Sequence, residues 1–413
     1  MDMKHIMTTL LALALCATAT AQDFDKYFTD STLRLDYIFE GNARQQHIAL
    51  DQLNVSPRWY GKRQRLAELP VQGNGQLTMR DHKTRTAIYR NSFSTLFQEW
   101  LSYPEAEGAA RSFENVFLMP MPKDTVEVTI DLRNNRQEVI ASNTHTVVPS
   151  DILIRRIGKK PTPYTTLWQA RDTTRCIHIA FVAEGYTEGE METFVADAHT
   201  AMDAIFAHEP FKSMRDRFNV VAVKAVSAES GTSSPATGEW KNTALGSHFD
   251  TFYSSRYLTT LRLKTLHDVL AGTPYEHIIV LVNTDQYGGG GILNSYNLAM
   301  THHPKFRPVV VHEFGHSFAG LADEYAYDFE DIPMYPHDVE PWEPNITTKV
   351  DFRNKWENLI GTDSQAGFYE GAGYSLKGVY RAYPDCRMRT NENPEFCKAC
   401  RQALVRLINF YTE

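Results

Sequence analysis

The chain has 413 residues, a length that accommodates two domains of ordinary size. Hydrophobic residues make up 42% and charged residues 22%, so we expect packed cores and not a disordered chain. The formal net charge of −8 repels phosphate backbones, and no stripe of Lys and Arg offsets it. Nucleic acid is therefore not an expected partner.

Residues 1–21 have the features of an export signal. A positively charged start precedes an apolar stretch at 6–15, and small residues follow up to a cleavage site after Ala21. This stretch is shorter than the roughly 20 apolar residues that cross a bilayer. Lipidation at Cys16 is the alternative to simple cleavage, but the bulky Leu15 before it disfavours lipidation. We expect a protein exported to the periplasm, the cell surface or the medium, with no transmembrane segment.

Residues 22–160 are expected to form a small N-terminal β-sandwich domain that folds independently. Residues 126–132 alternate between apolar and polar types, as half-buried strands do, and residues 33–39 alternate less regularly. Turn-forming Gly and Asn pairs separate such segments, and one short helix is expected at 94–101. No motif with a chemical role falls in this part of the chain.

The pattern changes after a connector with two prolines, and residues 161–413 are expected to form the catalytic domain. Alternating strands and helices are typical of an α/β domain. The expected strands are 177–183, 218–226 and 278–282, and the expected helices are 188–211 and 251–270.

Four consecutive glycines, Gly288–Gly291, interrupt this alternation. They lack the Lys and Ser/Thr of a phosphate-binding loop, so we expect a flexible hinge. Residues 292–300 are strand-like, and we expect them to bind a substrate backbone as an added edge strand.

The most informative segment is a His-Glu-x-x-His motif at His312, Glu313 and His316. Residues four apart on a helix project from one face, so both imidazoles aim at one point, as a catalytic zinc requires. Glu313 lies where it can take a proton from zinc-bound water. With 15 His in the chain and about half of its 50 acidic residues being Glu, about 0.03 such motifs arise by chance. We therefore predict a zinc site with Glu313 as the catalytic residue.

The sequence around the motif suits a helix. Pro308 is compatible with a first helical turn, and Gly320 with a helix end. Val311, Phe314 and Phe318 fall on the face away from the motif, where we expect them to be buried.

The stretch from His312 to Tyr325 resembles the IgA-peptidase-like zinc metallopeptidases, peptidase family sixty-four. The resemblance covers Ile177 to the C-terminus, including the closing segment Cys386–Cys400, and extends to the β-domain before it. It implies a metzincin-like catalytic domain, in which Met388 forms a tight turn beneath the metal.

Three features depart from the general metzincin pattern. The glycine that follows the second histidine comes one residue late, at Gly320. The third-ligand position is an aspartate, and Thr390 stands where many metzincins place a tyrosine, two residues after the methionine. Stabilisation of the transition state is left open among Tyr380, Tyr383, Arg389 or no comparable group.

A catalytic zinc needs a third protein ligand. In the metzincin pattern this ligand lies three residues beyond a glycine that turns the chain back, and counting from Gly320 gives Asp323. Glu324 is the alternative, but neighbouring side chains in an extended turn point to opposite sides. Glu324 is then expected to orient a ligand histidine or to face water. The predicted metal ligands are His312, His316 and Asp323.

Removal of Cys16 with the signal leaves Cys176, Cys386, Cys397 and Cys400. An oxidising compartment favours disulfides, and four cysteines allow three full pairings, among which the sequence does not choose. The Cys-x-x-Cys pair does not follow a βαβ unit, so a structural staple is favoured over redox chemistry.

These observations favour an exported zinc endopeptidase that hydrolyses peptide bonds of a protein or glycoprotein. The alternative is a surface protein that binds glycan or protein and carries a non-catalytic zinc. Structural zinc normally has four protein ligands, often cysteine, and needs no neighbouring glutamate, which favours the enzyme. The natural substrate and the oligomeric state stay open.

Overall fold

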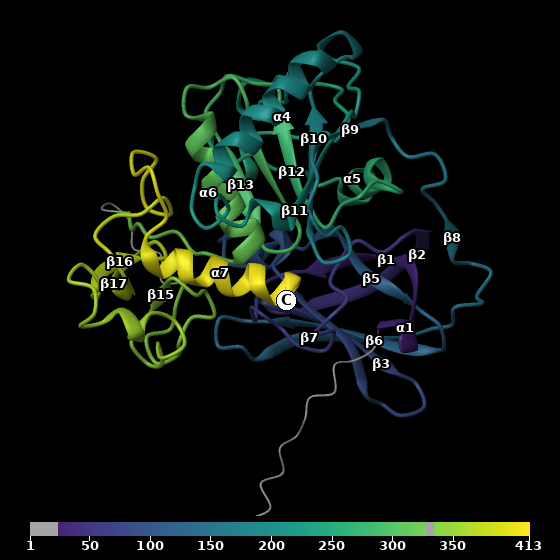
Figure 1. The fold of residues 1–413 in the computed structure, drawn as a ribbon, viewed down its shortest axis with the longest axis horizontal. Coiled ribbons are helices and arrows are strands. Elements are labelled where there is room, and N and C mark those ends of the chain that lie inside the picture. The colour runs from purple at the N-terminus through teal and green to yellow at the C-terminus, as the bar shows by residue number, and fades with distance from the viewer. Residues whose placement is uncertain (1–23, 328–333) are drawn as a thin grey trace, which may run out of the picture.

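The computed structural model describes residues 24–327 and 334–413 (Figure 1). The expected export signal, residues 1–21, lies outside the described residues. Within the described ranges, no helix combines the length and the apolar character needed to span a membrane. The chain is organised around four β-sheets and is of mixed α/β type.

The N-terminal part holds two four-stranded sheets. One has the order β5-β1-β2-β8, with β1 (Phe28–Gly41), β2 (Gln46–Pro57), β5 (Arg111–Pro122) and β8 (Arg155–Arg156). The other has the order β4-β3-β6-β7, with β3 (Gly75–Asp81), β4 (Ala87–Phe93), β6 (Val126–Arg133) and β7 (Val139–Val147). Three short helices accompany them: α1 (Phe24–Tyr27), α2 (Leu96–Trp100) and α3 (Glu105–Gly108).

Local sequence explains several of these elements. The strict alternation at 126–132 produces β6, whose apolar residues are buried and whose polar residues are partly exposed. The expected short helix is α2, which begins after Thr95, whose side chain accepts a hydrogen bond from Gln98 N. Phe93 of β4 contacts Phe117 of β5 with ring centroids 4.2 Å apart, so the two sheets share an aromatic core.

The C-terminal part is built on a six-stranded sheet of order β13-β14-β12-β10-β11-β9. Its strands are β9 (Tyr164–Trp168), β10 (Ile177–Glu184), β11 (Phe218–Val223), β12 (His277–Val282), β13 (Gly289–Ile292) and β14 (Tyr296–Met300). The four central strands are parallel and the two edge strands antiparallel. Every residue of β10 and β12 is buried, because central parallel strands are covered on both faces.

Helices and a small sheet complete this part. The helices are α4 (Met191–Phe206), α5 (Leu263–Leu270), α6 (Phe306–Ala319) and α7 (Lys398–Thr412). Short 3₁₀ helices lie at Glu188–Glu190, Arg215–Arg217, Pro235–Thr237, Thr251–Tyr253 and Glu357–Leu359. A three-stranded sheet, β15 (Ile346–Thr347), β17 (Ser375–Arg381) and β16 (Tyr369–Ala372), lies beyond one end of α7 (Figure 1).

Three expectations for this part are wrong. The helix expected at 251–270 begins only at Leu263, because Phe252 and Tyr253 adopt positive φ angles of 50° and 64°, which are incompatible with a continuous α-helix. The glycine run is not a hinge, since it forms the edge strand β13. Residues 292–300 do not offer an edge to a substrate, because β14 pairs with β12 on one side and β13 on the other.

The two parts pack against each other over a continuous apolar core. Across this boundary, the buried Arg34 of β1 donates a hydrogen bond to Asp268 of α5 at 2.6 Å, and it also binds Asp36 of its own strand at 2.7 Å. The Nδ1 atom of His178 in β10 lies 2.9 Å from the Tyr60 carbonyl oxygen. The two parts therefore share buried apolar and polar contacts.

Candidate metal and catalytic site

Helix α6 carries the His-Glu-x-x-His motif and ends as its sequence predicts. Pro308 lies in its first turn, and Gly320 follows its last residue in the left-handed conformation with φ 60°. The Gly320 N–H donates to His316 O, and the next N–H, that of Leu321, donates to Gly315 O at 3.2 Å. These two bonds turn the chain back towards the helix. The face of Val311, Phe314 and Phe318 is buried, as expected.

The structure brings His312, His316 and Asp323 together. The two Nε2 atoms lie 3.0 Å apart, and Asp323 Oδ1 is 3.0 Å from His312 Nε2 and 3.4 Å from His316 Nε2. The aspartate is buried, and the histidines are partly buried. Three donor atoms from three side chains thus converge on one point.

Backbone contacts orient both imidazoles. His312 Nδ1 donates to Arg387 O at 3.1 Å, and His316 Nδ1 donates to Leu321 O at 2.5 Å. With Nδ1 protonated in this way, each Nε2 presents a lone pair to the common point.

This arrangement fits a zinc ion. Two imidazole lone pairs and a carboxylate oxygen that face one another repel unless a cation lies between them. Asp323 Oδ1 is buried without a hydrogen-bond partner. Bonds of about 2.0 to 2.1 Å in a tetrahedral shell place ligand atoms about 3.3 Å apart, which is close to the separations found here.

Met388 packs against helix α6 at Gly315. It is fully buried, and a Cβ added to Gly315 of α6 would lie 2.7 Å from its sulfur, so only glycine allows this approach. Its segment forms a tight turn in which the N–H groups of Arg389 and Thr390 donate to Cys386 O. The same turn supplies the carbonyl group that orients His312.

Strand β13 lies against Glu313. A Cβ on Gly289 would come within 2.7 Å of Glu313 Oε1, and a Cβ on Gly291 within 2.5 Å of Glu313 O and 3.0 Å of His316 Cβ. The glycine run therefore lets a sheet edge approach Glu313 and His316 closely. The glycine run is visible in the sequence, but its contact with Glu313 is visible only in the structure.

Electrostatics differ among the site residues. Burial raises the pKa of Glu313, while His312 and His316 partly offset this effect. Burial lowers the pKa of His316, but without a metal ion the adjacent Asp323 carboxylate outweighs burial and raises that pKa to about 9, so a metal that binds here displaces a proton from Nε2. Burial disfavours the charged form of Asp323, yet the two histidines hold its pKa well below the ordinary range.

Two further residues reach the site without a sequence signal. The Tyr374 hydroxyl donates a short hydrogen bond to Asp323 Oδ2, which leaves Oδ1 to face the histidines. Tyr374 stands at the β16–β17 turn, far from the motif in sequence. Glu99 of α2 accepts a hydrogen bond from Tyr257 at 2.5 Å, and burial raises its pKa to about 7. The N-terminal part thus contributes a carboxyl group near the site.

The residues considered for transition-state stabilisation are engaged elsewhere. Tyr383 donates to Asp363 at 3.0 Å, and the Tyr380 ring lies 3.5 Å from the ammonium group of Lys349. Arg389 pairs with Asp385 at 3.9 Å.

Glu324 and the cysteines also differ from expectation. The Glu324 side chain is fully buried and neither faces water nor contacts the two histidines, since its Oε1 accepts from Asn345 at 2.9 Å and lies 3.0 Å from Cys400 Sγ. All four described cysteines are free thiols, and Cys386 Sγ lies 3.7 Å from Cys400 Sγ, too far for a disulfide.

Comparison with known families gives two matches. The family described as IgA peptidase M64 matches residues 165–365 and 361–408, and the peptidase M64 N-terminus family matches residues 23–144. No curated protein matches the chain significantly. The boundary between the two matches agrees with the separation of the N-terminal sheets from the six-stranded sheet. With more than half of its length matched by the first family, the chain belongs to the IgA peptidase M64 family of peptidases.

Proposed function

We propose that this protein is an exported zinc-dependent endopeptidase with a metzincin-like catalytic domain and an N-terminal β-sandwich. The convergence of three donor atoms at 3.0 to 3.4 Å, with both histidines held in the ligating tautomer, carries the proposal. Membership of a peptidase family supports it, and the signal-like residues 1–21 support export.

His312, His316 and Asp323 are the residues that would hold the metal. A bound zinc ion would supply Lewis-acid polarisation of the scissile carbonyl group and of a water molecule. Tyr374 would hold Asp323 with Oδ1 directed inward, and the carbonyl groups of Arg387 and Leu321 would hold the imidazoles.

Glu313 would serve as the general base. Its carboxylate takes a proton from the attacking water and then passes that proton to the nitrogen of the leaving amine. Burial favours the first step, because the raised pKa of Glu313 makes its carboxylate a stronger proton acceptor. Gly289 keeps the carboxylate in place, because it allows the sheet edge to lie directly against it.

A direct test measures cleavage of a denatured protein mixture by the purified protein before and after treatment with a chelator. Cleavage should cease on chelation and return with stoichiometric zinc. Bound zinc without any cleavage of the mixture or of an unbiased peptide library would instead favour the binding protein with a non-catalytic metal. The peptide library also identifies the preferred substrate sequence.

A further inference from the structure

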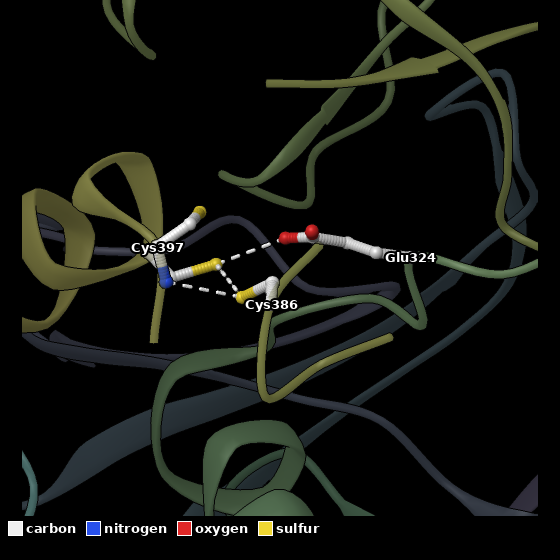
Figure 2. Close-up of side chains that lie close together, drawn as sticks. Glu324, Cys386 and Cys397 are labelled. Carbon is white, nitrogen blue, oxygen red and sulfur yellow. Dashed lines mark hydrogen bonds between the residues drawn. The ribbon is translucent and has the colours of Figure 1, made fainter. Parts of the chain in front are cut away.

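A second cluster of side chains that can bind a metal lies next to the candidate active site, because its member Glu324 directly follows Asp323 in the chain. Glu324, Cys386, Cys397 and Cys400 each offer one donor atom, and these four atoms lie within 4.8 Å of one another. All four residues are buried. Figure 2 shows the labelled side chains of Glu324, Cys386 and Cys397 grouped at the start of helix α7, where three separate segments of chain meet.

The spacing of the donors is that of a tetrahedral thiolate site. Zinc–sulfur bonds of about 2.3 Å place two sulfur ligands about 3.8 Å apart, and Cys386 Sγ and Cys400 Sγ are 3.7 Å apart. The Cys397-x-x-Cys400 pair has the ligand spacing common in structural zinc sites. The backbone N–H of Cys397 donates to Cys386 Sγ at 3.2 Å, the kind of contact that orients a thiolate ligand.

The Glu324 carboxylate lacks a partner that a cation would supply. Its Oε1 accepts from Asn345, but its Oε2 is buried without a hydrogen-bond partner. A buried carboxylate without a counter-charge is costly. A disulfide between two of the cysteines would leave the third thiol and this carboxylate uncompensated, whereas one cation engages all four side chains.

We propose that Glu324, Cys386, Cys397 and Cys400 form a second, structural site for a thiophilic divalent cation, with zinc as the expected ion. Four protein ligands close the shell, so the site has no open position for catalysis. It would join the segment after α6, the Met388 turn and the start of α7. The Glu324 N–H already donates to Met388 O at 2.8 Å. The cysteine site would therefore stabilise the segment after α6 and the Met388 turn, which both shape the candidate active site.

Zinc analysis of the chain produced from residue 22 tests this proposal. Besides any zinc at the His312 site, the wild-type protein should contain one zinc ion that is lost in Cys397→Ser and retained in His312→Ala. Cys176→Ser is the matched control, since Cys176 lies apart from the cluster beside His178 and Asn219 and should leave the zinc content unchanged. Because the assay counts cysteine-dependent metal, its outcome is independent of peptidase activity.

Two measurements on the wild-type chain keep the proposal testable even where the serine variant misfolds. Cobalt substitution should give a thiolate-to-cobalt charge-transfer band, which the His312, His316 and Asp323 site has no sulfur to produce. Thiol titration after denaturation with chelator and without reductant should find all four thiols of Cys176, Cys386, Cys397 and Cys400 free. A count lower by two would show a disulfide, and that result, or the absence of the cobalt band, would overturn the proposal.

Discussion

Asp323 and Glu324 are adjacent in the chain, yet their carboxylates belong to different clusters. Asp323 Oδ1 lies 3.0 Å from His312 Nε2, whereas Glu324 Oε1 lies 3.0 Å from Cys400 Sγ. The chain after Gly320 belongs to no helix or strand up to Tyr325, and it directs these two neighbouring side chains to different clusters. One dipeptide therefore links the candidate catalytic site to the cysteine cluster.

This relationship predicts different outcomes for two neighbouring substitutions. Asp323→Ala should lose the zinc held by the histidines and all measurable peptidase activity, because the two remaining ligands, His312 and His316, are too few to hold the metal. Glu324→Ala should retain that zinc and cleave peptides, although its thermal stability should fall. Activity, zinc content and thermal unfolding of both variants check this. Loss of activity in a folded Glu324→Ala protein, with activity kept in Asp323→Ala, would reverse the assignment.

The role of Glu313 predicts separation of metal binding from catalysis. Glu313→Ala should keep zinc but lose at least about 100-fold in rate, since no other group would accept the proton from water. Glu192→Ala, at an exposed position of α4, is the control and should keep normal activity. Near-normal hydrolysis by a zinc-loaded Glu313→Ala protein would rule out this mechanism.

Tyr374 is predicted to act through Asp323. Tyr374→Phe removes the hydrogen bond to Oδ2 and should weaken zinc binding about 10- to 100-fold, the usual effect of losing a group that orients a ligand. Competition with a chromogenic chelator measures this affinity. Tyr369→Phe, which removes a hydroxyl bonded to Gln365 O, should bind zinc like the wild type. Equal affinities for the two variants would contradict the proposed role.

Gly289 is predicted to be needed for the position of the base. In Gly289→Ala the new methyl group would lie 2.7 Å from Glu313 Oε1, so the carboxylate must move. We expect kcat to fall about 10- to 100-fold with zinc content unchanged, because a displacement of about 1 Å has effects of this size. Gly108→Ala is the control, since its added Cβ meets no atom within 4 Å. Unchanged kcat in Gly289→Ala would show that the contact is not important.

Glu99 predicts a pH dependence of stability. Burial raises its pKa from 4.5 to about 7 in the folded protein, so the folded state holds this proton more tightly than the unfolded chain. The stabilisation is complete below pH 4.5 and is lost as the pH rises through about 7. Glu99→Gln should therefore be more stable than the wild type at pH 8 by roughly 1 to 3 kcal/mol. At pH 5 this difference in the free energy of unfolding should be smaller.

Urea unfolding of both proteins at the two pH values measures this difference. The same pH dependence in Glu99→Gln and wild type would show that Glu99 ionises normally. The variant keeps an oxygen that accepts the hydrogen bond from Tyr257, so the comparison isolates the charge.

Local sequence determined much of the candidate site. The spacing of His312 and His316 places both imidazoles on one helix face, and Gly320 ends that helix because glycine readily adopts a left-handed conformation. The alternation at 126–132 and the apolar runs at 177–183 and 278–282 likewise produced β6, β10 and β12. Each of these outcomes follows from a local sequence pattern, namely helical spacing, a glycine at a helix end or the distribution of apolar residues along a strand.

Tertiary structure alone decided the rest. Tyr374 reaches Asp323, the glycines of β13 reach Glu313, and Glu324 reaches Cys400 across long stretches of chain. The sequence determined which side chains can bind a metal or accept a proton, because that chemistry belongs to the residue. It did not determine which of them meet, because such pairings depend on how strands and helices pack over a core drawn from both parts of the chain.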